Sequence, residues 1–235
     1  MIEKGMPIDA ALYADTGMDY PEMEKHIQAL DGFLYHERGI RVTRLKHPKG
    51  FEWLMFEEPK QKPSCLERRR RAGIPPFGNG WPGPRVRWCT WQLKTHLIRR
   101  EIARLKQGGK VIEHIGIAAD EAWRCKDKRY PLVEWGVTET KALEYCYERG
   151  YTFGGLYEIY SRASCWCCPF QHTDSLRKLR KHHPELWARL LAMDYRARAQ
   201  FGDTPPGIFR KGWTVERLDE RFAREDAGTV LKTIL

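Results

Sequence analysis

The sequence predicts an α/β fold with a mainly parallel sheet and flanking helices, followed by a helical C-terminal extension. Residues 8–14 form an apolar run typical of a buried parallel strand, and residues 40–46 and 111–118 are two further strand candidates. Helical segments separate these strands, which is the order expected of a parallel sheet. We therefore expect an α/β domain over residues 1–171 and the extension over residues 172–235.

The predicted helices are recognised by apolar spacing and by the residues at their ends. Pro21 suits a first helical turn, and Thr138 suits an N-cap. Residues 47–87 are rich in proline and are predicted to form a long functional loop or lid. The predicted helices are residues 22–30, 93–106, 138–149, 174–181, 184–199 and 215–224.

Charge and composition restrict the partners and the compartment that we expect for this chain. Lys plus Arg number 41 against 31 Asp plus Glu, a net charge of +10. This surplus favours anionic partners such as nucleotides, phosphates, sulfates or nucleic acid. No run approaches the roughly 18 apolar residues of a membrane span, and residues 1–7 show no secretory leader. We therefore expect a cytoplasmic protein that has no membrane partner.

The seven cysteines indicate metal or redox chemistry, because their number is odd and three fall within four residues. Cys165 and Cys168 have the C-x-x-C spacing that lets one turn supply two thiolate ligands. Cys167 adds a third thiol, Cys89 is the upstream candidate, and Cys65 is an additional candidate ligand. An iron–sulfur cluster, a zinc ion and unmetallated buried thiols all remain open.

The tripeptide Asp15, Thr16 and Gly17 follows the first predicted strand, at the end of the sheet where α/β proteins bind ligands. The same tripeptide occurs in aspartic proteases, but those enzymes need two such carboxylates, and this chain has one copy. A capped strand-to-helix turn and a nucleotide-contacting turn both remain open. The arginine run at residues 68–71 either binds phosphates or forms a solvated basic loop.

Four segments resemble the phosphoadenosine phosphosulfate (PAPS) reductase family, within the PP-loop adenine-nucleotide hydrolase superfamily. Residues 13–22 (YADTGMDYPE) resemble its second strand and turn. The other three resemble its phage and mobile-element members: RWCT at residues 87–90 with Lys94, IAADEAWR at residues 117–124 leading to RYPL, and CWCCPF at residues 165–170. The resemblance covers about residues 1–200.

The resemblance implies a sheet that binds ATP or PAPS, in reductases, ATP pyrophosphatases or sulfurtransferase-like enzymes of DNA phosphorothioation. Asp15, Thr16 and Gly17 would line the nucleotide crevice, beside a [4Fe–4S] cluster or zinc held by the cysteines. Cationic side chains would stabilise the charge that develops when a nucleophile attacks an activated nucleotide, since guanidinium groups suit oxyanions. The cationic candidates are Arg87, Lys94, Arg124, Arg129 and Arg162, and Glu121 is a candidate to orient one of them.

The chain departs from this family in its phosphate site. The family's Ser-Gly-Gly-x-Asp-Ser loop is absent, and the glycines at residues 108–109 precede a predicted strand instead of a helix. We therefore expect an N-terminally incomplete copy of the fold that binds ATP poorly. The exposed edge beside residues 8–14 would then need a second copy or a partner chain to cover it.

The reductases of this family also carry a catalytic cysteine near the C-terminus, and this chain has none after Cys168. The catalytic residue is therefore left unassigned. The alternative function is a non-catalytic, metal-stabilised accessory protein that binds nucleic acid, which would suit both the positive charge and the missing loop.

Overall fold

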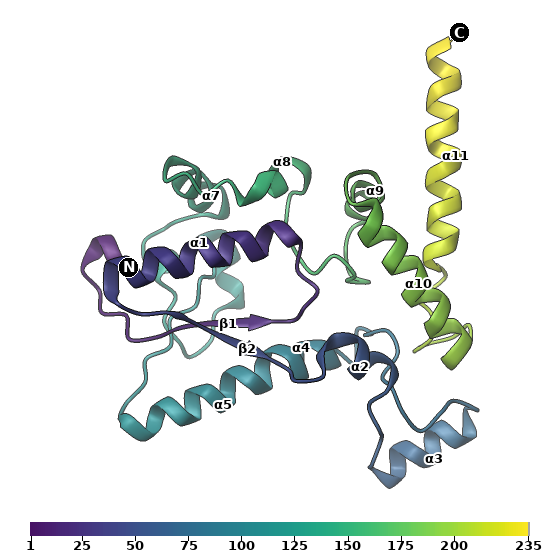
Figure 1. Cartoon of the computed structure of the whole chain (residues 1–235), viewed down its shortest axis with the longest axis horizontal. Coiled ribbons are helices and arrows are strands. Elements are labelled where there is room, and N and C mark those ends of the chain that lie inside the picture. The colour runs from purple at the N-terminus through teal and green to yellow at the C-terminus, as the bar shows by residue number, and fades with distance from the viewer. Residues whose placement is uncertain (235) are drawn as a thin grey trace. The chain divides into compact units, whose positions relative to one another are not determined.

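The computed structural model describes residues 1–234 and has a mixed α/β fold in which helices predominate. Within those residues the sheet has two parallel strands, β1 (Ala11–Asp15) and β2 (Val42–Lys46). They are connected by α1 (Pro21–Arg38), and α1 and α5 (His96–Leu105) lie on opposite sides of the strands (Figure 1). The first two predicted strands are therefore confirmed, and Pro21 does occupy the first turn of its helix.

Short helices make up most of the remaining elements, and the last two helices of the chain are longer. The remaining elements are η1 (Ile2–Lys4), α2 (Gly50–Phe56), α3 (Pro63–Arg71), α4 (Trp88–Thr90), the π-helical η2 (Trp91–Thr95), η3 (Lys106–Gly108), η4 (Ala119–Arg124), α6 (Pro131–Glu134), α7 (Glu139–Glu148), η5 (Phe153–Gly155), α8 (Leu156–Ile159), α9 (Thr173–His182), α10 (Pro184–Phe201) and α11 (Val215–Ile234).

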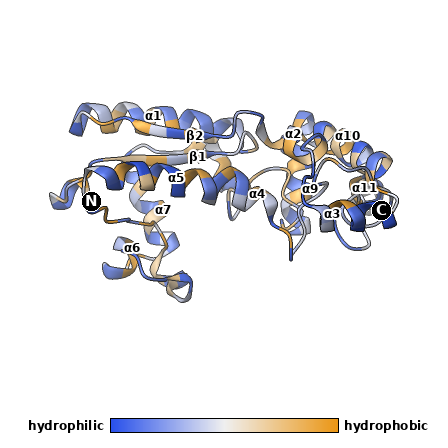
Figure 2. Ribbon diagram, turned by 90° about the horizontal axis from the view of Figure 1, so that it is seen from below, coloured by the Kyte–Doolittle hydropathy of each residue, from blue (hydrophilic) through white to orange (hydrophobic). Residues whose placement is uncertain are grey.

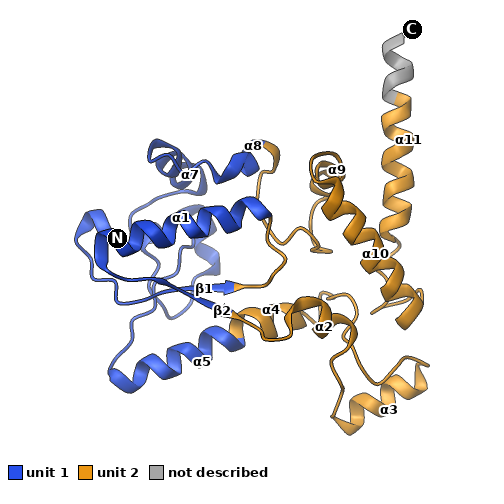
Figure 3. Cartoon of the chain, in the orientation of Figure 1, with its two compact units in different colours: residues 1–14, 21–45, 96–158 blue, residues 15–20, 46–95, 159–235 orange. Residues whose placement is uncertain are grey.

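The chain divides into two compact units that interleave along the sequence (Figure 3). Unit 1 consists of residues 1–14, 21–45 and 96–158, and unit 2 of residues 15–20, 46–95 and 159–235. Unit 1 therefore holds most of both strands. Unit 2 combines the turn after β1, the cysteine segment and the C-terminal helices.

In unit 1, α1 packs against η5. The rings of His26 and Phe153 lie 4.3 Å apart between centroids. Gly154 has a φ of 61°, and a Cβ placed on it would lie 2.7 Å from Cγ of Glu22. Glycine is therefore needed at residue 154 for two reasons, the left-handed backbone and the close approach of α1.

In unit 2, the core forms where α2 meets the C-terminal helices, and hydrophobic residues gather around α2 and α10 (Figure 2). Asp194 is buried in α10 and accepts a 3.0 Å hydrogen bond from the amide of Val215, at the start of α11. The core side chains of this unit include Leu54, Met55, Phe56, Leu176, Leu179, Trp187, Leu190, Met193, Phe201, Leu218 and Phe222.

Two sequence predictions are wrong. Residues 111–118 do not form a strand: they make one parallel bridge, His114 to Arg129, and Ile112 and Ile115 are exposed instead of covered. Residues 47–87 are not a continuous loop, because they contain α2 and α3. One proline of this segment begins α3, and the stretches that become α2 and α3 contain no proline after their first residue.

The predicted cap of α7 is confirmed: Oγ1 of Thr138 accepts a hydrogen bond from the amide of Lys141 at 3.3 Å. The helices predicted at 174–181, 184–199 and 215–224 correspond to α9, α10 and α11. Among residues 1–234, no helix combines the length and the apolar character needed to cross a membrane.

Candidate functional site

The turn that follows β1 is fixed by its own side chains. Oδ1 of Asp15 accepts a hydrogen bond from the amide of Gly17 at 2.8 Å, and Oγ1 of Thr16 accepts one from the amide of Met18 at 3.1 Å. Nζ of Lys46, at the end of β2, lies 3.5 Å from Oδ2 of Asp15. The carboxyl ends of both strands therefore lie at one edge, where α/β sheets bind ligands.

This turn contacts the cysteine segment directly. Oγ1 of Thr16 lies 3.6 Å from Sγ of Cys165, and the Thr16 side chain is buried. The amide of Trp166 donates a 3.0 Å hydrogen bond to the carbonyl of Met18, and Sγ of Cys165 lies 3.8 Å from Oδ1 of Asp19. Two motifs that are distant in the sequence therefore form one site within unit 2.

The thiol turn, residues 165–168, is also held by hydrogen bonds. The amide of Cys168 donates to the carbonyl of Cys165 at 3.1 Å. The side-chain amide of Gln171 donates to the carbonyls of Cys165 and Trp166, at 2.7 and 2.9 Å. Arg210 in turn donates to the carbonyl of Gln171 at 3.0 Å. The turn is thus tied to the segment that precedes α11.

Four thiols share one electrostatic environment. Burial is the main cause that raises the pKa of all four, to about 11 for Cys165 and well above the ordinary value for Cys167. The neighbouring thiolates of Cys165, Cys168 and Cys89 raise the pKa of Cys167 further. The structure therefore brings together Cys89 and the three cysteines of the thiol turn, as candidate ligands of one group.

Cationic side chains surround the thiol cluster, defined as Cys89, Cys165, Cys167 and Cys168. Arg87, Lys94 and Arg210 each oppose the effect of burial and lower the pKa of Cys168. The guanidinium of Arg87 also lies 4.7 Å from the ring centroid of Phe170. Arg87 and Lys94 were predicted as anion ligands; Arg210 was not, because it has no local motif.

The thiol cluster suits a soft or borderline metal by its donor atoms, since four thiolates can bind zinc or an iron–sulfur cluster. In residues 1–234, however, no three His, Cys, Asp or Glu side chains converge closely enough to hold an ion as they stand. A shared ion would therefore require the thiols to move closer together. Asp19 is a neighbour that the sequence reasoning missed, although it lies two residues after Gly17 in the same motif.

Cys65 and the arginine run lie elsewhere in unit 2. Cys65 is on α3, where Arg68 contacts its sulfur at 3.9 Å. The run at residues 68–71 is the last turn of α3, so its prediction as a loop is wrong. Arg69 is buried and donates hydrogen bonds to the carbonyls of Pro75 and Phe77, at 2.6 and 2.7 Å. The run thus contributes to folding through Arg69.

Three predicted site residues, Glu121, Arg124 and Arg129, lie in unit 1, where carboxylates pair with both arginines. Arg124 forms an ion pair with Glu121. Arg129 forms a two-pronged ion pair with Glu134, with both N–O distances at 2.7 Å. Arg162 is exposed in unit 2, between α8 and the thiol turn. The structure therefore groups Asp15, Thr16, Gly17, Arg87 and Lys94 with the thiol cluster, and it shows ion pairing for Arg124 and Arg129.

Comparison with known proteins does not identify a family for this chain. No protein-family model matches the sequence, and neither a curated protein nor a solved structure matches it significantly.

Proposed function

We propose that this chain is a PAPS-reductase-like protein that binds an adenine nucleotide beside a cysteine metal site and serves sulfur or nucleotidyl chemistry. The observation that carries this proposal is the contact of the turn after β1 with the thiol turn, through Thr16 and Cys165 at 3.6 Å. A nucleotide at the carboxyl end of β1 would lie beside thiols and cations. This is the arrangement that the family resemblance implies.

Cys89, Cys165, Cys167 and Cys168 would hold the metal. A zinc ion would stabilise the fold, and a [4Fe–4S] cluster would also supply redox chemistry. Support comes from the burial of Cys167, the partial burial of the other three thiols, and their mutual electrostatic interaction. All seven cysteines of the chain are free thiols, which fits the reducing cytoplasm that we propose as its compartment.

Asp15, Thr16 and Gly17 would line the nucleotide crevice, with ATP or PAPS as the substrate. Arg87 and Lys94 would bind its phosphate or sulfate, because charge-assisted hydrogen bonds to oxyanions are strong. Arg124 and Arg129 remain candidates of the same kind, but each would first have to leave its carboxylate partner. Positioned cations would stabilise the developing charge in nucleophilic attack on the activated nucleotide.

We further propose that the sheet is completed by a second copy or a partner chain into the mainly parallel sheet of this superfamily. Within the described residues each strand has a single neighbour, and all five positions of β1 are only half-buried. An exposed strand edge favours pairing with another chain. Light scattering on the purified protein tests the second copy: a dimer supports it, and a monomer at high concentration contradicts it and leaves a different partner chain as the proposal.

The central experiment combines metal analysis with nucleotide titration. Protein purified without oxygen should contain zinc, or iron with labile sulfide. It should also bind adenine nucleotides, weakly because the sequence has no Ser-Gly-Gly-x-Asp-Ser loop, and Thr16→Val should weaken that binding further without removing the metal. Metal-free protein that binds no adenine nucleotide would contradict the proposal.

The alternative, a non-catalytic accessory protein that binds nucleic acid, keeps the support of the +10 charge. It loses the support of the arginine run, since Arg69 is buried and Arg70 and Arg71 pair with Glu67. Salt-sensitive DNA binding without nucleotide turnover would favour this alternative.

A further inference from the structure

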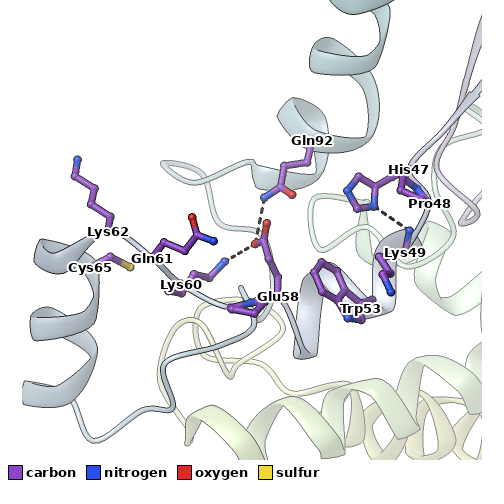
Figure 4. A pocket seen from close by; sticks show the side chains of 11 residues that line it. His47, Pro48, Lys49, Trp53, Glu58, Lys60, Gln61, Lys62, Cys65 and Gln92 are labelled. Carbon is purple, nitrogen blue, oxygen red and sulfur yellow. Dashed lines mark hydrogen bonds and ion pairs between the residues drawn. The ribbon is translucent and has the colours of Figure 1, made fainter.

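A second basic site lies in unit 2, and Cys65, named above as an additional candidate ligand, is one of the residues that line it. An open cavity of about 610 Å³ is bordered by the start of α2, by the segment leading to α3 and by Gln92. In Figure 4, Trp53 and Lys49 lie on one side of Glu58, and Lys60, Gln61 and Lys62 lie on the other. This volume falls within the range typical of small-molecule sites, about 300–1,000 Å³.

Trp53 forms the aromatic wall of the cavity. Phe51, Leu54 and Met55 on the same helix are buried in the core, whereas Trp53 is half-buried and lines the cavity. The His47 ring stacks beside the indole at 6.4 Å between centroids, with 23° between the two planes. The helix therefore anchors a flat aromatic surface at the edge of an open space.

Glu58, the one carboxylate among the described residues that line the cavity, is already neutralised. Glu58 forms an ion pair with Lys60 and accepts hydrogen bonds from Asn79 at 2.7 Å and from Gln92 at 3.3 Å. Lys60 also donates to Oδ1 of Asn79 at 2.7 Å. This network holds Glu58 and Lys60 in place and cancels their charges. The other charged side chains that line the cavity are lysines, so its net charge is positive.

That positive charge is supplied by Lys49 and Lys62. Neither ammonium has a carboxylate partner among the residues that the structure describes, and Nζ of Lys49 lies 5.8 Å from the Trp53 ring centroid. Gln61, also at the cavity, is exposed and carries both a donor and an acceptor. An aromatic surface with flanking ammonium groups and amides suits a planar base that carries an anionic group.

We propose that this cavity binds a nucleobase stacked on Trp53 together with its adjoining phosphate on Lys49 and Lys62. Aromatic side chains stack on any base, and lysines bind the backbone phosphates, which is the chemistry of single-strand recognition. A free nucleotide presents the same two groups. The proposal is independent of the thiol cluster and of any metal there.

The proposal is tested on the full chain by fluorescence anisotropy. The probe is a labelled oligothymidine of ten nucleotides, and AMP is the competitor. Trp53→Ala should weaken oligonucleotide binding by about tenfold, and Trp53→Phe should retain most of the affinity. The double variant Lys49→Ala/Lys62→Ala should make the slope of log K against log salt less negative by about 0.7, the value expected for loss of one phosphate contact on a single strand.

Matched controls remove the same residue types elsewhere. Trp123→Ala removes a tryptophan that is 83% exposed in unit 1, and Lys181→Ala/Lys211→Ala removes two exposed lysines of unit 2. Both controls should bind like the wild type. Circular dichroism confirms that each variant is folded.

Each outcome bears on the proposal. Tight oligonucleotide binding that depends on Trp53 and the lysines supports it and identifies a nucleic-acid strand as the source. AMP binding with the same dependence, and no gain for the oligonucleotide, supports it with a free nucleotide. No binding of either probe, or equal binding by variants and controls, overturns it. None of these variants changes a residue of the thiol cluster, so their metal content should equal that of the wild type, and the proposed function is judged separately.

Discussion

Oγ1 of Thr16 lies 3.6 Å from Sγ of Cys165, although 149 positions separate the two residues in the chain. This contact links the end of β1 to the thiol turn. It is reinforced by the hydrogen bond from the amide of Trp166 to the carbonyl of Met18. A substitution in the thiol cluster should therefore alter the turn after β1, where we propose that the nucleotide binds.

The first prediction concerns the thiol cluster. Cys168→Ala should remove the bound zinc or iron and lower the melting temperature by about 5 °C or more, because ligation free energy is also folding free energy. Metal analysis and thermal unfolding measure the two effects. Cys125→Ala is the control, since Cys125 lies in unit 1 and should change neither. Unchanged metal content and melting temperature in Cys168→Ala would rule out the site.

A second prediction separates the candidate anion ligands. Arg87→Ala should weaken binding of an adenine nucleotide about tenfold, as expected for loss of one charge-assisted hydrogen bond. Arg129→Ala should have little effect, because Glu134 already occupies the edge of that guanidinium formed by Nε and Nη2. Titration calorimetry measures both affinities. If Arg129→Ala weakened nucleotide binding more than Arg87→Ala, the anion site would lie in unit 1 instead.

The third prediction concerns pH. Burial opposes ionisation of Glu58, but hydrogen bonds from Lys60, Asn79 and Gln92 outweigh it and lower its pKa. A lowered carboxyl pKa stabilises the fold above the ordinary value of 4.5, and this stability is lost as the pH falls through the lowered pKa. The difference in melting temperature between wild type and Glu58→Gln should therefore be largest near neutral pH and shrink below pH 4.5. A difference that does not vary with pH would contradict this assignment.

The arginine run provides the fourth prediction. Arg69→Ala should cost about 2–4 kcal/mol of unfolding free energy, because it removes a buried guanidinium that donates charged hydrogen bonds to the carbonyls of both Pro75 and Phe77. Arg70→Ala removes only an exposed ion pair with Glu67 and should leave the stability nearly unchanged. Urea unfolding of the two variants measures the contrast, and equal effects would contradict the structural role of Arg69.

The fifth prediction uses two glycines that both have positive φ. A Cβ on Gly78 would lie 2.7 Å from Cζ of Phe201 and 2.8 Å from the carbonyl oxygen of Met55, whereas a Cβ on Gly73 meets no described atom within 4 Å. Gly73→Ala should cost about 1 kcal/mol for backbone strain alone. Gly78→Ala should cost about 1–3 kcal/mol more, because the core is overpacked. Chemical denaturation compares the two variants, and equal costs would contradict the crowding at Gly78.

Local signals in the sequence determined β2, the start of α1 at Pro21 and the cap of α7 at Thr138. Each of these depends on the chemistry of a few adjacent residues, such as the fixed φ of proline or the hydroxyl that accepts an amide hydrogen bond. The cysteine spacing likewise indicated which thiols could act together. None of these predictions depends on contacts with distant parts of the chain.

Only the tertiary structure decided the rest, because those features depend on contacts between distant residues. Within residues 1–234, the apolar residues 111–118 have no strand partner beyond the bridge to Arg129, so their strand-like pattern does not produce a strand. Arg69 is buried because α3 turns it toward two carbonyls, a position that four consecutive arginines do not reveal. Thr16 meets Cys165, and Arg210 approaches Cys168, because folding brings together segments that the sequence separates.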